Sequence, residues 1–359
     1  MQALHARPSH LKSRWRKWLC WGSILGLLLI SVPALAQRPK SPMPTAKKET
    51  EVAQGAKRDA SPRSEQEEKT KPQAVDLQTD DGVLIAATYF PPIRPGKDVP
   101  AVILLHGFGG TTGEKQSVFW PTGGKRDLAF ALQERGYAVL TFDFRGHGHS
   151  TERMAGRAGE QKAGSGKLDF GELRTSAHFQ MLLQDIESAK RFLLQRNNAG
   201  ELNVAKLAVV GSEMGASLGV LWSYRDWQYP AQAGFSGKQG QDVLALVLIS
   251  PQYNFKGISI NKELTFLQQR IPMQFVVGRK DQKAFNDAEK MFQAARRAMP
   301  NETATTLTDL NTKVQAGKLI NPDLELDVDK EIASFLDSAL KKRAAKCEAR
   351  ELSEGENSK

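Results

Sequence analysis

Apolar positions follow two alternating patterns from about residue 74 to residue 343. Short continuous apolar runs, such as VPAVILLHG at 99–107, are typical of strands buried on both faces of a parallel sheet. Longer stretches with apolar residues at helical spacing, such as RDLAFALQERG at 126–136, predict amphipathic helices. Before these, Asp80-Asp81-Gly82 separates two short apolar runs and predicts a hairpin.

Strands and helices alternate after this hairpin. Strands are predicted at 74–79, 83–90, 99–107, 137–144, 206–210, 243–250, 273–278 and 303–310, and helices at 126–136, 178–196, 214–227, 287–299 and 329–343. This alternation indicates one α/β domain over 74–343, with a mostly parallel central sheet and helices on both faces. The link between the sixth and seventh strands, 252–270, is short.

Residues 1–36 have the pattern of an export signal. A basic stretch, SRWRKW, leads into the apolar run LCWGSILGLLLISVPALA, which ends in Ala34-Leu35-Ala36. Cleavage after this site would make Gln37 the first residue of a periplasmic or secreted protein. The alternative is an uncleaved N-terminal membrane anchor, since the run is nearly long enough to span a bilayer. Pro33 and the Ala-x-Ala ending favour cleavage, and in both cases the main body lies outside the cytoplasm.

Two further segments lack the regular pattern of the domain. Residues 37–73 combine mixed charge and prolines with almost no large apolar side chains, so we expect a disordered tether. Residues 344–359 form a charged C-terminal tail that contains Cys347. The other cysteine, Cys20, leaves with the signal, so we expect no intramolecular disulfide and interpret Cys347 as an exposed thiol.

The formal charge of +10 first suggests nucleic acid as a partner. The first 36 residues, however, contain five basic and no acidic residues, and much of the remaining excess lies in the segment after them. The folded part shows no basic stripe with interleaved aromatic residues. We therefore expect no nucleic-acid partner, and membrane contact only through the N-terminal segment if it stays uncleaved. The sequence assigns no oligomeric state.

Three short motifs follow predicted strands, at the edge of the sheet where open α/β folds bind their ligands. They are LLHGFGG at 104–110, FDFRGHGHS at 142–150 and VVGSEMGAS at 209–217. In this order the motifs resemble the α/β-hydrolase superfamily, of which D-x-R-G-x-G-x-S is a specific marker. The resemblance covers roughly residues 74–343 and is greatest to lysophospholipase-like and small-esterase members. It implies an α/β-hydrolase fold and an esterase-type site, and the link at 252–270 is too short for the large lid domain of some members.

The resemblance identifies the third motif with the nucleophile elbow G-x-S-x-G, in which Gly211 and Gly215 are the two glycines. Glu213 stands where the family has its serine. Ser212 is adjacent, but a step of one residue along this turn directs its side chain elsewhere. The alternative interpretation of the whole motif is an ordinary turn between a strand and a helix, in which the small residues are needed only for packing.

The resemblance also implies an oxyanion hole formed by the backbone N–H groups of Phe108 and Met214. His106 and Gly107 belong to the family's oxyanion loop, where glycine lets the backbone approach a substrate. Met214 opens the helix after the elbow, and the helix dipole favours negative charge at this end. We expect the Glu213 carboxylate to fold back and occupy the hole.

The two remaining triad positions differ from each other. Asp281, in VVGRKDQKAF, matches the family's acid position, although an aspartate before a helix also serves as an N-cap. The family's histidine follows the last strand, and the matching stretch TDLNTKVQAGK at 308–318 contains none, so this position is empty. All histidines of the chain precede the elbow, against the order of the triad: His5, His10, His106, His147, His149 and His178.

These residues lead to two alternative functions. His147 and His149 offer only two metal ligands in a loop that the resemblance implies is structural, so we predict no metal and no cofactor. A small-molecule or acyl-ester ligand suits the expected site. Because two triad positions are degenerate, we expect a non-catalytic pseudo-hydrolase with a binding or scaffold role. The alternative is an active carboxylic-ester hydrolase with an atypical nucleophile, Glu213, or an atypical base.

Overall fold

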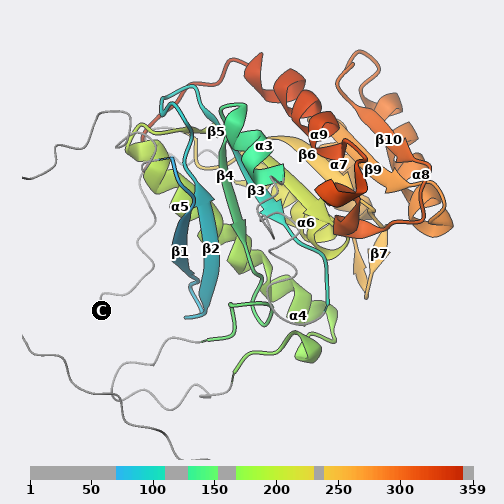
Figure 1. Ribbon diagram of the computed structural model, residues 1–359, viewed down its shortest axis with the longest axis horizontal. Coiled ribbons are helices and arrows are strands. Elements are labelled where there is room, and N and C mark those ends of the chain that lie inside the picture. Colours follow the sequence, from blue (N-terminus) through green and yellow to red (C-terminus); the bar gives the residue numbers. More distant parts are fainter. Residues whose placement is uncertain (1–69, 110–127, 153–166, 230–237, 351–359) are drawn as a thin grey trace, which may run out of the picture. The chain divides into compact units, whose positions relative to one another are not determined.

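The computed structural model describes residues 70–109, 128–152, 167–229 and 238–350. This part of the chain contains an eight-stranded sheet in the order β1-β2-β4-β3-β5-β6-β9-β10 (Figure 1). Its strands are β1 (Gln73–Gln78), β2 (Leu84–Phe90), β3 (Pro100–Leu105), β4 (Ala138–Phe142), β5 (Asn203–Ser212), β6 (Val243–Ile249), β9 (Met273–Gly278) and β10 (Thr306–Leu310). β2 pairs antiparallel with β1 and β4, and all other pairs are parallel. The mostly parallel sheet and its opening hairpin are confirmed.

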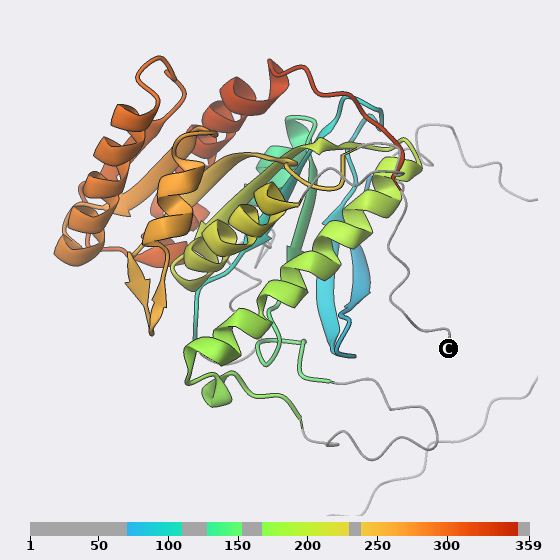
Figure 2. The same cartoon turned by 180° about the vertical axis from the view of Figure 1, so that it is seen from behind.

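Helices cover both faces of the sheet, which explains the continuous apolar runs of its central strands. Every residue of β3, β4, β5 and β9 is buried. Helices α3 and α9 share a hydrophobic cluster with one face, and α5 to α8 share another with the opposite face (Figure 2). The helices are α3 (Leu128–Glu134), α4 (Ser176–Met181), α5 (Leu183–Asn198), α6 (Met214–Gln228), α7 (Asn261–Leu267), α8 (Gln282–Ala298) and α9 (Val328–Leu336).

Some elements differ from their predicted bounds. The single helix expected at 178–196 is two helices, α4 and α5, which meet at Leu182. The last helix changes after α9 into a π-helical turn, η4 (Asp337–Lys341). A small hairpin, β7 (Asn254–Phe255) and β8 (Ile258–Ser259), precedes α7 and was not predicted. Because only this hairpin and α7 connect β6 to β9, no large lid domain is inserted there.

The two ends of the chain are described to different extents. Residues 1–69, which include the expected export signal and most of the expected tether, lie outside the described residues. In the described ranges no helix is both long and apolar enough to cross a membrane. At the other end, residues 345–350 lie against the domain. The exposed thiol expected at Cys347 is wrong, because this side chain is partly buried and donates from Sγ to the Asn197 side chain at 3.4 Å.

Candidate active site

The sharp turn between β5 and α6 places Glu213 at the carboxyl edge of the sheet. Glu213 has φ 47° and ψ −105°, a backbone conformation that residues with a Cβ seldom adopt. Its amide donates to the carbonyl of Ile249 at 3.0 Å, and its carbonyl accepts from the amide of Ser217 at 3.1 Å. A strained residue at a sharp turn between a strand and a helix is the geometry that the elbow motif predicts, here with a glutamate at its tip.

Gly211 and Gly215 allow the close crossing of β5, α6 and β3. A Cβ on Gly211 would lie 2.3 Å from the carbonyl oxygen of Gly215, and a Cβ on Gly215 would lie 2.3 Å from that of Leu105. Backbone atoms cannot move aside as the end of a flexible side chain can, so no other residue fits at either position. Packing therefore explains both glycines of the motif.

The Glu213 side chain turns toward Gly107, in the loop that the family resemblance identifies as the oxyanion loop. A Cβ on Gly107 would come within 2.8 Å of Glu213 Oε2, so the carboxylate lies directly over the backbone of Gly107. Ser212, in contrast, is fully buried at the end of β5, and burial keeps its hydroxyl away from any substrate. Glu213 is therefore the elbow residue that faces the site.

His106 ties the oxyanion loop to the chain that follows β4. Its Nε2 accepts a hydrogen bond from the amide of Phe144 at 2.9 Å, so Nδ1 carries the ring proton and donates to the carbonyl of Gly107 at 2.6 Å. Since His106 is also buried and both ring nitrogens are engaged by the backbone, it is not placed to act as a general base. Met214, the residue of the second expected oxyanion donor, is buried as the first residue of α6.

Phe108, on the same loop, packs in a cluster of aromatic side chains. Its ring centroid lies 5.6 Å from that of Phe170, 5.8 Å from Phe179 and 6.0 Å from Phe255, all near edge-to-face. The ammonium of Lys256 stands 3.7 Å from the Phe108 centroid. Phe255 and Lys256 come from the β7–β8 hairpin, so this unpredicted element stabilises the oxyanion loop through aromatic and cation–π contacts.

Asp281 stands just before α8, and its carboxylate accepts from the amide of Ala284 at 3.3 Å. This is the geometry of an N-cap, the alternative role that the sequence allowed. The loop at 311–315, which matches the family's histidine loop, packs on the end of β9. A Cβ on Gly278 would lie only 2.4 Å from the carbonyl oxygen of Val314 in that loop. The fold thus brings the acid position and the empty histidine position to the same strand end.

The other described histidines are His147, His149 and His178, and the rings of His147 and His178 lie within hydrogen-bond distance of backbone atoms. His147 is fully buried, with Nδ1 3.2 Å from the carbonyl of Arg145. His149 is exposed and its amide donates to Asp143 at 2.9 Å, while burial raises the pKa of the Asp143 carboxyl. His178, in α4, accepts a backbone hydrogen bond through Nδ1 at 3.2 Å. Over the described ranges, no group of three or more His, Cys, Asp or Glu side chains is arranged to hold a metal ion.

A buried ion pair anchors the D-x-R-G-x-G-x-S turn to α5. Arg145 donates from Nε to Asp185 at 2.8 Å and from Nη2 to Asp81 at 3.0 Å. Asp185 is fully buried, and burial raises its pKa to about 6 against the opposing effect of Arg145. Sequence reasoning missed this pair, although an aspartate on the apolar face of a predicted helix was the available signal.

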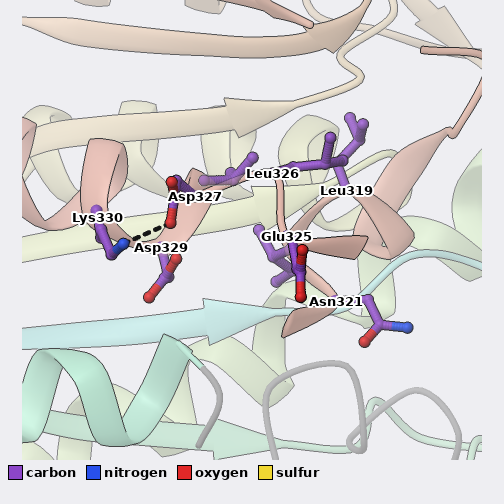
Figure 3. A pocket seen from close by; sticks show the side chains of 9 residues that line it. Leu319, Asn321, Glu325, Leu326, Asp327, Asp329 and Lys330 are labelled. Atoms are coloured by element: carbon purple, nitrogen blue, oxygen red, sulfur yellow. Dashed lines mark ion pairs between the residues drawn. The ribbon is translucent and has the colours of Figure 1, made fainter. Parts of the chain in front are cut away.

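A pocket of about 460 Å³ lies elsewhere, between η2 (Ala316–Ile320) and the start of α9. Figure 3 shows its acidic side chains and the ion pair of Asp327 with Lys330, at 2.6 Å. None of the residues assigned to the triad or the oxyanion hole lines it. Its lining residues are Leu319, Ile320, Asn321, Glu325, Leu326, Asp327, Val328, Asp329 and Lys330.

Comparison with known families agrees with this geometry. A family model described as the alpha/beta hydrolase fold matches residues 100–276, a range that contains the oxyanion loop and the elbow. The chain belongs to the α/β-hydrolase superfamily. No curated protein sequence matches this α/β-hydrolase significantly.

Solved structures share the fold at low sequence identity. An esterase of Pyrococcus furiosus aligns with a TM-score of 0.51 and 17% identity, over 76% of this chain and 92% of its own. The acylaminoacyl peptidase of Pyrococcus horikoshii aligns with a TM-score of 0.51 and 11% identity, over 78% of this chain and 43% of its own. Dipeptidyl peptidase 4 of Porphyromonas gingivalis aligns with a TM-score of 0.52 and 13% identity, over 76% of this chain and 36% of its own. The likeness concerns the fold alone.

Proposed function

We propose that this α/β-hydrolase is a non-catalytic binding or scaffold protein, a pseudo-hydrolase with the family's architecture but without its chemistry. The observation that carries the proposal is Glu213 at the strained tip of the elbow. An esterase of this type needs a nucleophile at the tip, a base that removes its proton and an acid that orients the base. Glu213 has no hydroxyl, and the one beside it, on Ser212, is buried.

The histidine loop supports the same proposal. Residues 311–315 contain no histidine, and His106 is engaged by backbone through both ring nitrogens. A carboxylate nucleophile does not remove this requirement. If Glu213 formed an ester with a substrate, water would still need a base to hydrolyse that ester and free the protein.

The position of the Glu213 carboxylate adds an electrostatic argument. Ester hydrolysis places negative charge on the substrate oxygen next to the oxyanion loop. In this protein a carboxylate already lies over Gly107 in that loop, so a developing oxyanion meets like charge. We infer that the ligand of this site, a small molecule or an acyl compound, is bound without being hydrolysed.

We further propose that the protein is exported and acts in the periplasm or outside the cell. The support is the sequence pattern of residues 1–36, with its basic start, apolar run and Ala-x-Ala ending. An uncleaved anchor would place the same domain outside the cytoplasm but leave it attached to the membrane.

Hydrolysis of substituted phenyl esters by the purified protein tests the proposed loss of catalysis. We expect the native rate to equal that of Glu213→Ala, with Ser212→Ala as a second control. A native rate that falls in Glu213→Ala would establish the alternative, an active ester hydrolase with a carboxylate nucleophile. A thermal-shift screen with lipids and acyl compounds identifies the ligand, because binding to the folded state raises Tm.

A further inference from the structure

The segment 345–350 is held on the domain in the manner of a bound peptide. It contains no helix or strand, and three asparagine side chains at the end of α5 and the start of β5 donate to its carbonyl groups. The contacts are Asn197 to Glu348 at 2.8 Å, Asn198 to Arg350 at 2.7 Å and Asn203 to Ala345 at 2.8 Å. Because the acceptors of these three bonds are backbone carbonyls of the segment, the bonds depend little on its side chains.

Arg350 supplies the side-chain anchor. Its guanidinium donates from Nη1 and Nη2 to the two oxygens of Asp242, at 2.6 and 2.7 Å, and both side chains are almost fully buried. A bidentate pair of this kind requires the planar fork of arginine, which a lysine ammonium cannot reproduce.

The buried carboxylates near Arg350 also favour a positively charged side chain at its position. Asp226 and Asp242 are buried side by side, and Lys190 forms ion pairs with both, at 3.0 Å from Asp242. Burial lowers the pKa of Lys190, but the two carboxylates outweigh burial and hold that pKa above its ordinary value. Without Arg350, two buried carboxylates would face one buried ammonium, since Lys238 reaches Asp242 only at 3.8 Å from a half-exposed position. Such an imbalance is unfavourable in a buried setting and favours a cationic occupant.

This site lies far from the elbow. Asn203 begins β5 and Ser212 ends it, which separates the two by roughly 30 Å at about 3.3 Å per residue. Figure 2 shows the C-terminal segment crossing from the end of α9 to the C-terminal end of α5. The two sites therefore share no residue.

We propose that Asn197, Asn198, Asn203 and Asp242 form a peptide-docking site for a linear segment that carries one arginine. Its resident occupant is residues 345–350 of the same chain. The three asparagines bind the backbone of the segment, and Asp242 binds its arginine side chain. Once the resident segment is released, the site binds the same segment from a second copy of the chain.

The test uses the full chain with a protease recognition sequence inserted between Arg343 and Ala344, where the chain lies outside helices and strands. The folded protein is cut under reducing conditions and passed through a gel-filtration column. We expect the fragment from Ala344 onward to elute with the domain. We further expect it to exchange with a fluorescent peptide of the same sequence, followed by anisotropy.

Peptide variants separate docking from non-specific association. Arg350→Ala should weaken binding at least about 30-fold, because it leaves Asp242 buried without this partner, and Arg350→Lys should also weaken it. Lys346→Ala, at an exposed side chain, is the matched control and should change affinity less than about twofold. Failure of the native peptide to bind, or equal binding by Arg350→Ala, would overturn the proposal. So would loss of the cooperative thermal transition on cutting, since the segment would then belong to the folding core.

Discussion

Replacing Glu213 by glycine should give a more stable protein than replacing it by alanine. A residue with a Cβ in the backbone conformation of Glu213, φ 47° and ψ −105°, costs about 1–3 kcal/mol. Glycine avoids this cost but loses roughly 0.5–1 kcal/mol through the greater freedom of its unfolded chain. The expected net gain is about 1 kcal/mol relative to Glu213→Ala, which removes the same carboxylate but keeps the Cβ.

The measurement is the free energy of unfolding of both variants in urea, with Tm as a second readout. A gain of about 1 kcal/mol corresponds to roughly 2–4 °C in Tm. Glu289, exposed within α8, gives a control of opposite sign. Glu289→Gly should have a free energy of unfolding about 1 kcal/mol lower than Glu289→Ala, because glycine is less favourable than alanine within a helix. If Glu213→Gly were no more stable than Glu213→Ala, the elbow backbone would not be strained and the argument would fail.

Four other predictions have defined outcomes. Glu213→Ser should remain unlabelled by a fluorophosphonate probe for want of a base, and adding Thr312→His should give the first labelling. Gly107→Ala should destabilise the native protein but not the Glu213→Ala variant, with a coupling of about 0.5–1 kcal/mol in a double-mutant cycle. Burial raises the pKa of Asp185 to about 6 in the folded state, so the protonated carboxyl is favoured by folding. This contribution to the free energy of unfolding is fully present below about pH 4 and is lost as pH rises through 6. Asp185→Asn should therefore gain up to about 3 kcal/mol on the native protein between pH 4 and pH 7, measured by urea unfolding. N-terminal sequencing of protein secreted by a bacterial host should begin at Gln37, whereas an intact Met1 in the membrane fraction would indicate an anchor.

Local patterns were sufficient to predict most of the sheet. Strands at the centre of the sheet, such as β3 and β6, are short apolar runs rich in branched residues, which favour buried strands over helices at that length. The β7–β8 hairpin was missed because its strands have two residues each, too few for any periodic signal. The break at Leu182 was missed because apolar residues continue through it at helical spacing.

The same contrast between local and long-range signals applies to the functional residues. The elbow and its glutamate were predictable because the motif is contiguous in sequence, and the strain at Glu213 follows from the turn that the motif forms. The docking of Arg350 on Asp242 joins residues 108 positions apart, and a charged tail gives no sign of where it lies. Asp281 keeps two interpretations, since an N-cap and a triad acid require the same residue type before a helix.

The packing of the elbow has an evolutionary consequence. Its steric demands fall on Gly211 and Gly215, whose Cβ positions are filled by backbone atoms, whereas the Glu213 side chain at the tip points toward Gly107. A substitution of either glycine disturbs the crossing of β5 with α6, so selection for folding alone retains both. The side chain at the tip is under no such steric constraint, so the fold tolerates different side chains at position 213. The two glycines therefore indicate the fold, whereas the identity of residue 213 bears on the chemistry.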